Sequence, residues 1–125
     1  MHAPSLTAPF VVALLALPPA YAQKATEQFI PIGQSPGISG THTWIGEIVA
    51  SDSRALTLNV RGAQGPVTVR LTDKTRIFLD RSKLKQSNLA GSVADLQKGR
   101  LVEVRYEGSA EALTADWVKV EITQR

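Results

Sequence analysis

The sequence predicts a small all-β domain whose strands close into a barrel, and three observations lead to this prediction. From residue 43 onward, apolar and polar residues alternate in short runs, which is typical of half-buried antiparallel strands. Residues that favour turns, mainly Gly, Pro, Asp and Ser, separate these runs at short intervals. Between the runs, no apolar pattern with helical spacing is as long as an ordinary helix.

The segment before residue 43 predicts a signal peptide and a linker arm. Residues 6–17 are mostly apolar and precede Ala-Tyr-Ala at 20–22, a small-x-small cleavage site, so we expect residues 1–22 to be removed on export. This run is shorter than the roughly 20 apolar residues of a membrane span, so the mature chain should keep no transmembrane segment. Residues 23–42 are rich in Pro and Gly and predict an extended arm, part of which should lie on the domain formed by residues 43–125. The predicted location is periplasmic or secreted.

The first three predicted strands follow one another with short turns. In residues 43–50, Trp44 and Ile48 fall on one face of the strand. Residues 56–61 and 67–72 alternate in the same way, and the Gly-Ala-Gln-Gly-Pro sequence between them predicts a hairpin loop. This hairpin is the clearest in the sequence.

A short strand at residues 75–79 is predicted next, and a polar, basic stretch continues from it to residue 91. A capped helical turn follows, because Ser92 and Asp95 have the spacing of a capping box. Gly99 supplies the left-handed residue that ends this turn. The turn therefore leads directly into the next strand.

The last two predicted strands are residues 100–106 and 113–122. In the final strand, apolar residues before Asp116 follow one period-2 register and those after Trp117 follow the other, which predicts a β-bulge between them. A bulge bends a strand as barrel closure requires. The predicted fold is thus a small antiparallel barrel of five to six strands, with one short helical turn before the fifth. This order resembles the oligonucleotide- and oligosaccharide-binding (OB) fold with one strand added.

Alternation also predicts which residues are buried. The residues expected in the core are Val102, Val104, Leu56 and Leu58. The carboxylates at outward strand positions, expected in solvent, are Glu47, Glu103 and Glu121. Trp44 and Trp117 are expected to pack in the core, and the alternative is that Trp117 faces outward as part of a small docking patch.

Composition argues against metal sites and enzymatic chemistry. The chain has no cysteine, and His42 is the only histidine after the predicted cleavage site, so we expect neither a metal nor a cofactor. Residues 82–85 match the Ser-x-x-Lys pattern of β-lactamases, but the further motifs and the larger scaffold of those enzymes are missing. We therefore expect a non-enzymatic protein.

Positive charge is concentrated between residues 70 and 85. This segment carries six basic and two acidic residues, a local charge of +4, whereas the whole chain carries +3. A cation beside an aromatic ring on one strand face is typical of nucleic-acid or glycan binders. The predicted ligand-binding residues are Arg76, Phe78, Arg81, Lys83 and Lys85. The alternative is a solvated loop edge that keeps the strands from pairing with other molecules.

Four short motifs resemble an uncharacterised family of small exported bacterial β-barrel domains. They are Gly46-Glu47-Ile48, Thr75-Arg76-Ile77, the segment from Asp95 to Val104, and Ala115-Asp116-Trp117-Val118. The resemblance implies a fold and an exported location, and it brings no catalytic residue.

Two functions are compatible with these observations. The first is an exported, non-enzymatic binding or accessory module that acts on an envelope protein or another ligand. The alternative is an OB-like binder of anionic polymers, such as nucleic acid, lipopolysaccharide phosphates or acidic glycans.

Overall fold

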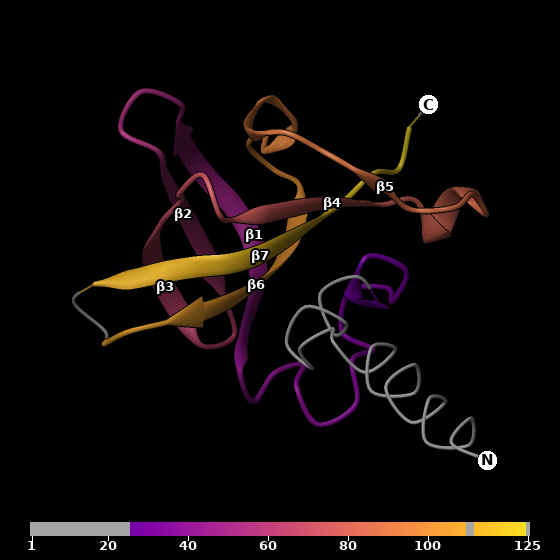
Figure 1. The fold of residues 1–125 in the computed structure, drawn as a ribbon, viewed down its shortest axis with the longest axis horizontal. Coiled ribbons are helices and arrows are strands. Elements are labelled where there is room, and N and C mark those ends of the chain that lie inside the picture. The colour runs from indigo at the N-terminus through magenta and orange to yellow at the C-terminus, as the bar shows by residue number, and fades with distance from the viewer. Residues whose placement is uncertain (1–25, 110–111, 125) are drawn as a thin grey trace, which may run out of the picture.

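The computed structural model describes residues 26–109 and 112–124, so the predicted signal peptide lies outside the described residues. The described residues form seven strands. In Figure 1, β7 crosses the middle of the fold. The strands are β1 (Thr43–Asp52), β2 (Thr57–Gly62), β3 (Gly65–Arg70), β4 (Arg76–Asp80), β5 (Leu89–Ala90), β6 (Leu101–Glu107) and β7 (Leu113–Glu121). Two short 3₁₀ helices, η2 (Ser82–Leu84) and η3 (Val93–Asp95), lie in the connections. Within the described residues, no helix has the length and apolar character needed to cross a membrane.

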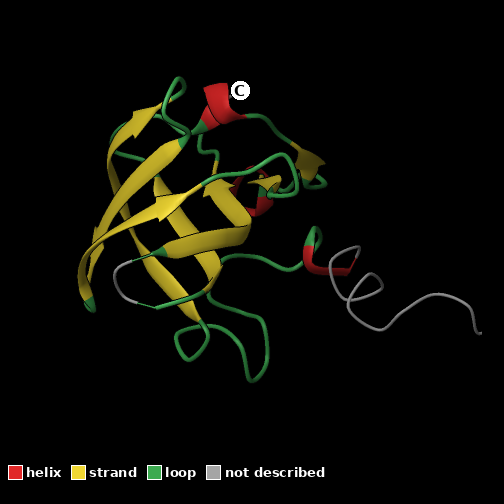
Figure 2. Cartoon of the chain, turned by 60° about the vertical axis from the view of Figure 1, so that its left-hand side comes forward, coloured by secondary structure: helices red, strands yellow, loops and turns green. Residues whose placement is uncertain are grey.

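Five of the strands close the barrel, in the order β1, β2, β3, β7, β6 and back to β1. Figure 2 shows how the strands curve around one another. The pairs β1–β2, β2–β3, β1–β6 and β6–β7 are antiparallel, whereas β3 and β7 pair in parallel. Strand β4 continues this parallel pairing along the second half of β7, and β5 pairs with β4 outside the barrel. The structure is therefore an all-β, OB-like barrel with extra strands.

The bulge predicted in the last strand is confirmed. Arg105 of β6 pairs with Trp117, and the next residue, Tyr106, pairs with Ala115, so Asp116 is the additional residue on β7. The bulge keeps Ala115 and Val118 on the inner face although they lie in opposite period-2 registers. The final strand can therefore contribute to the core along its whole length.

The predicted capped turn is also confirmed. The carboxylate of Asp95 accepts the main-chain amide of Ser92 at 2.8 Å, the reach-back contact of a capping box. Gly99 has φ of 91°, and its amide donates to the carbonyl oxygen of Ile48 on β1 at 2.9 Å. The turn is thus tied to the barrel where it feeds β6.

The core contains most of the residues that alternation predicts, with one exception. Val102, Val104 and Leu58 are buried at the centre of the barrel. Leu56 is 39% exposed, so its predicted place in the core is wrong. It lies in the turn between β1 and β2 with φ of 54°, and its carbonyl oxygen accepts the amide of Leu71 just beyond the β2–β3 pairing. A residue that turns the chain cannot keep the face assigned to it by strand alternation.

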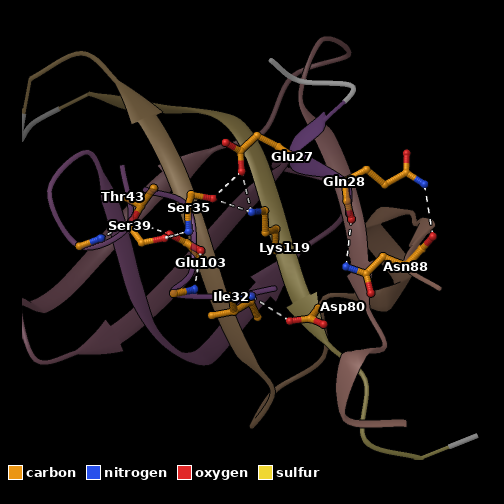
Figure 3. A network of polar contacts seen from close by, with 12 residues as sticks. Glu27, Gln28, Ile32, Ser35, Ser39, Thr43, Asp80, Asn88, Glu103 and Lys119 are labelled. Atoms are coloured by element: carbon orange, nitrogen blue, oxygen red, sulfur yellow. Dashed lines mark hydrogen bonds and ion pairs between the residues drawn. The ribbon is translucent and has the colours of Figure 1, made fainter. Parts of the chain in front are cut away.

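The arm packs on the outer face of β4, β6 and β7 and changes the burial of that face (Figure 3). Glu103 points away from the core as predicted, yet it is 0% exposed, so the prediction that it is solvated is wrong. Its carboxylate accepts hydrogen bonds from the amide of Gly33 at 2.9 Å and from Oγ1 of Thr43 at 2.8 Å. Glu121 is only partly exposed and forms an ion pair with Lys83, whereas Glu47 is exposed as predicted.

Candidate ligand-binding site

A hollow of about 960 Å³ lies on the outer face of the β2–β3 hairpin and at the adjacent open end of the barrel. The turn between β1 and β2 and the connection between β6 and β7 bound it on two sides. In OB folds the corresponding strand face and loops are where oligonucleotides and oligosaccharides bind. The residues that line the hollow are Trp44, Val49, Ala55, Thr57, Asn59, Val60, Arg61, Pro66, Val67, Thr68, Arg70, Tyr106, Gly108, Ala112 and Leu113.

Strand alternation places the polar lining residues. Leu58 and Val69 of the hairpin point into the core, so Asn59 and Thr68 point outward, where Oγ1 of Thr68 donates to Oδ1 of Asn59 at 2.7 Å. Arg61 and Arg70 lie on the same outer face at opposite ends of the hairpin. Because Arg70 pairs with Thr57, the two arginines are four residues apart along the ladder, or about 13 Å.

Two aromatic side chains line the open end of the barrel. Trp44 of β1 and Tyr106 of β6 contact each other edge to face, with ring centroids 6.1 Å apart. Nε1 of Trp44 donates to the carbonyl oxygen of Gly65 at 3.0 Å, which fixes the indole ring against the start of β3. Both rings are only half buried, so each presents part of its surface to the hollow.

The end of the barrel is open because β3 and β7 overlap by little. Their parallel pairing joins Val69 to Leu113 and Arg70 to Thr114, at the end of β3 and the beginning of β7. The first half of β3 therefore extends beyond the beginning of β7 and has no partner on that strand. Val67 lies in this part of β3 and lines the hollow beside the two aromatic rings.

The electrostatics of the hollow favour anions. Arg61 and Arg70 are exposed, and no carboxylate is among the described residues that line it. In the neighbouring β1–β2 turn, the amides of Ala55 and Arg54 donate to Asp52, and these bonds lower the pKa of that carboxyl group. Asp52 therefore stays ionised, but it is not among the residues that line the hollow. Two cations then flank a surface of hydroxyl, amide and aromatic groups.

The ligand-binding residues predicted from the sequence lie elsewhere, on β4 and the loop after it. Arg76 is exposed at the start of β4. Phe78 shares the side of β4 that faces away from the core, as alternation predicts, but it is 4% exposed, so its predicted availability for stacking is wrong. The arm lies on this face of β4, where the amide of Ile32 donates to Asp80, two residues after Phe78.

The basic loop residues lie around η2, and two of them have partners. Nε of Arg81 donates to the carbonyl oxygen of Ser87 at 2.6 Å, which closes the loop. Nζ of Lys83 is 3.2 Å from a carboxylate oxygen of Glu121. Lys85 is exposed and ends η2 in a left-handed conformation with φ of 56°. The structure brings these residues together on one loop, and their role in binding stays a prediction.

The residues of the hollow were not among the site residues predicted from the sequence. The signal was nevertheless present, because the predicted hairpin places Arg61 and Arg70 on the face opposite Leu58 and Val69. What alternation cannot show is the position of the β6–β7 connection and of Tyr106 beside this face. Their position depends on barrel closure.

Trp117 was expected either to pack in the core or to face outward in a docking patch, and it matches each alternative only in part. It lies on the outer face of β7 with Lys119, and yet it is 1% exposed. The ring is covered on this face, so it does not form an exposed docking patch. Among the described residues, no group of three or more His, Cys, Asp or Glu side chains is arranged to hold a metal ion.

Comparisons with known proteins identify no family. No protein-family model matches the chain, and no curated protein matches it. Among solved structures, the crystal structure of CusF with Ag(I) is similar to this chain, with a TM-score of 0.44 and 10% sequence identity. The match covers 62% of this chain and 93% of the CusF chain. The assignment of the fold given above therefore rests on the strand pairing of this chain.

Proposed function

We propose that this protein is a non-enzymatic binding module of the bacterial envelope and that the hollow on the β2–β3 hairpin binds an anionic polymer. The observation that carries this proposal is the lining of the hollow by two arginines and two aromatic rings, without a carboxylate among the described lining residues. The export signal predicted from the sequence supports the location.

The spacing of the arginines suits a chain with repeated negative charges better than a single small anion. Arg61 and Arg70 are about 13 Å apart along the hairpin, too far to grip one phosphate or sulfate together. The hydrogen-bonded pair of Asn59 and Thr68 lies between them and can meet the neutral part of such a polymer. Trp44 and Tyr106 can stack on a base or a sugar ring at the barrel end.

The experiment compares two double variants that remove equal charge from different places. Arg61→Gln with Arg70→Gln alters the hollow, and Arg81→Gln with Lys83→Gln alters the basic loop. Binding to heparin, to a single-stranded oligo-dT and to lipopolysaccharide is measured for each variant over a range of salt concentrations.

We expect the hollow variant to bind at least one of the three probes about 10-fold or more weakly than the unmodified protein, with a shallower salt dependence. The affinity of the loop variant should fall by less than about threefold. If the ligand binds in the hollow, the loop charges act on it only from a distance, and salt screens such attraction beyond about 8 Å. The reverse order would move the site to the basic loop. If no probe binds and a pull-down from envelope extract retains a specific protein, the module is an accessory protein instead.

A further inference from the structure

Polar and charged groups bind the arm to the barrel. Figure 3 shows Glu27, Ser35 and the backbone near Ile32 lying across the outer face of β4, β6 and β7. Lys119 on this face is 0% exposed, and Glu27 of the arm is also buried. Buried charges need specific partners, so this contact is selective.

One part of the face binds a carboxylate. Nζ of Lys119 donates to Oε1 of Glu27 at 2.7 Å and to Oγ of Ser35 at 3.1 Å. Oγ of Ser35 in turn donates to Oε1 of Glu27 at 2.6 Å. The ammonium group also lies 4.4 Å from the centre of the Trp117 ring, a cation–π contact. The carboxylate of Glu27 is thus held by Lys119 of the face and by Ser35 of the arm itself.

The other part of the face binds main-chain groups. Asp80 accepts the amide of Ile32 and Glu103 accepts the amide of Gly33, each at 2.9 Å. Nδ2 of Asn88 donates to the carbonyl oxygen of Gln28, also at 2.9 Å. The face therefore recognises a peptide with a glutamate and, five and six residues later, two free amides.

Strand register gives this face a second set of partners when the arm is absent. Glu103 of β6 is paired directly with Lys119 of β7, so their side chains are cross-strand neighbours on one face. With the arm bound, each of these two side chains contacts the arm, and no ion pair joins them. If the arm leaves, the two charges can pair with each other. The empty face is thus not left with isolated buried charges.

We propose that this face is a peptide-binding site that also takes the arm of a second copy of the chain. The arm contacts described above come from residues 27–35, and the connection to β1 at residues 36–42 is bonded locally, within residues 35–43. This connection contains Gly37 and Gly40, both with positive φ. If it opens, the same contacts form between two copies, as in domain swapping. Within one chain the effective concentration of the arm is in the millimolar range, so a dilute sample should be monomeric.

The test uses a charge exchange in the full-length mature chain. Glu27→Lys and Lys119→Glu each place like charges together inside one chain, so each variant loses its own arm contact. In an equimolar mixture, the Glu27→Lys arm matches the Lys119→Glu face, and the unmodified arm of one chain matches the unmodified face of the other. Native mass spectrometry should show each variant alone as a monomer and the mixture mainly as a one-to-one heterodimer. The double variant, which restores the match within one chain, should be monomeric.

A mixture of the two folded variants that stays monomeric would overturn the proposal. If circular dichroism shows that either variant is unfolded, a cysteine test replaces it, because the chain has no cysteine of its own. Gln28→Cys and Asn88→Cys variants are refolded together at high concentration and oxidised. Random pairing of the two thiols already gives twice as much heterodimer as either homodimer. A disulfide-linked heterodimer in clear excess over this ratio supports exchange of the arm, and an amount at or below it refutes the exchange. Neither test involves Arg61 or Arg70, so its outcome is independent of the function proposed for the hollow.

Discussion

Glu103→Ala should destabilise the protein strongly, although strand alternation places this residue on the outside. The carboxylate accepts one hydrogen bond from Gly33 and one from Thr43, and Thr43 is itself fully buried. Hydrogen bonds to a charged group contribute about 1.5–3 kcal/mol each, which sets an upper limit of about 3–6 kcal/mol. Removing the carboxylate also removes its desolvation cost, and the arm can lift so that water reaches Gly33. We therefore expect a loss of about 2–4 kcal/mol.

Urea denaturation followed by tryptophan fluorescence measures this loss, because Trp117 is buried on the same face and Trp44 packs at the end of the barrel. In thermal unfolding the same change should lower Tm by on the order of 10–25 °C for a domain of this size. Glu47→Ala is the matched control, since Glu47 is exposed on β1 and should change stability by less than about 0.5 kcal/mol. Equal effects of the two variants would refute the docking of the arm over β6 in solution.

Two further predictions concern the core and the β1–β2 turn. Val104→Ala should cost about 1–3 kcal/mol in the same denaturation assay, because Val104 is fully buried; a loss below about 0.5 kcal/mol would contradict its position in the core. Asp52 should titrate below 3.8 in an NMR titration of the carboxyl carbons, since the amides of Ala55 and Arg54 lower its pKa. Because this pKa is lowered on folding, ionised Asp52 stabilises the folded protein above pH 3.8, and this contribution is lost as the pH falls through the folded-state pKa. In the Asp52→Asn variant, stability should therefore depend less on pH in the acid range. A value at or above 3.8 would show that the turn is open in solution.

The sequence predicts the barrel well because its signals are local. Alternation depends on neighbouring residues, and it correctly places Leu58, Val102 and Val104 inside. The bulge at Asp116 is also visible locally, as a change of register within one strand. Leu56 is wrong because a turn residue with φ of 54° interrupts the pattern, and Leu is an uncommon residue in that conformation.

The candidate site could be predicted only in part, because it depends on contacts between distant segments. The outward position of Arg61 and Arg70 follows from the hairpin pattern. The hollow between them and Tyr106 exists because β3 overlaps β7 by only a short parallel pairing, which the pattern of one strand cannot reveal. The density of positive charge in the sequence instead predicts a site on the loop after β4. In the structure, Arg81 and Lys83 of this loop contact residues of the same domain.

Phe78 and Glu103 were both predicted to be exposed, and both predictions are wrong for the same reason. In both cases alternation gives the correct face, and a segment far away in the sequence covers that face. On this face, Glu103 and Lys119 lie opposite each other on neighbouring strands. If the face were exposed to solvent, these two side chains could form an ion pair with each other. Each instead contacts the arm, whose own sequence supplies Glu27 together with apolar residues unusual for a free linker. An apolar stretch in a Pro- and Gly-rich arm that also carries an acidic residue is therefore a reason to expect docking on a strand face with a matching cation.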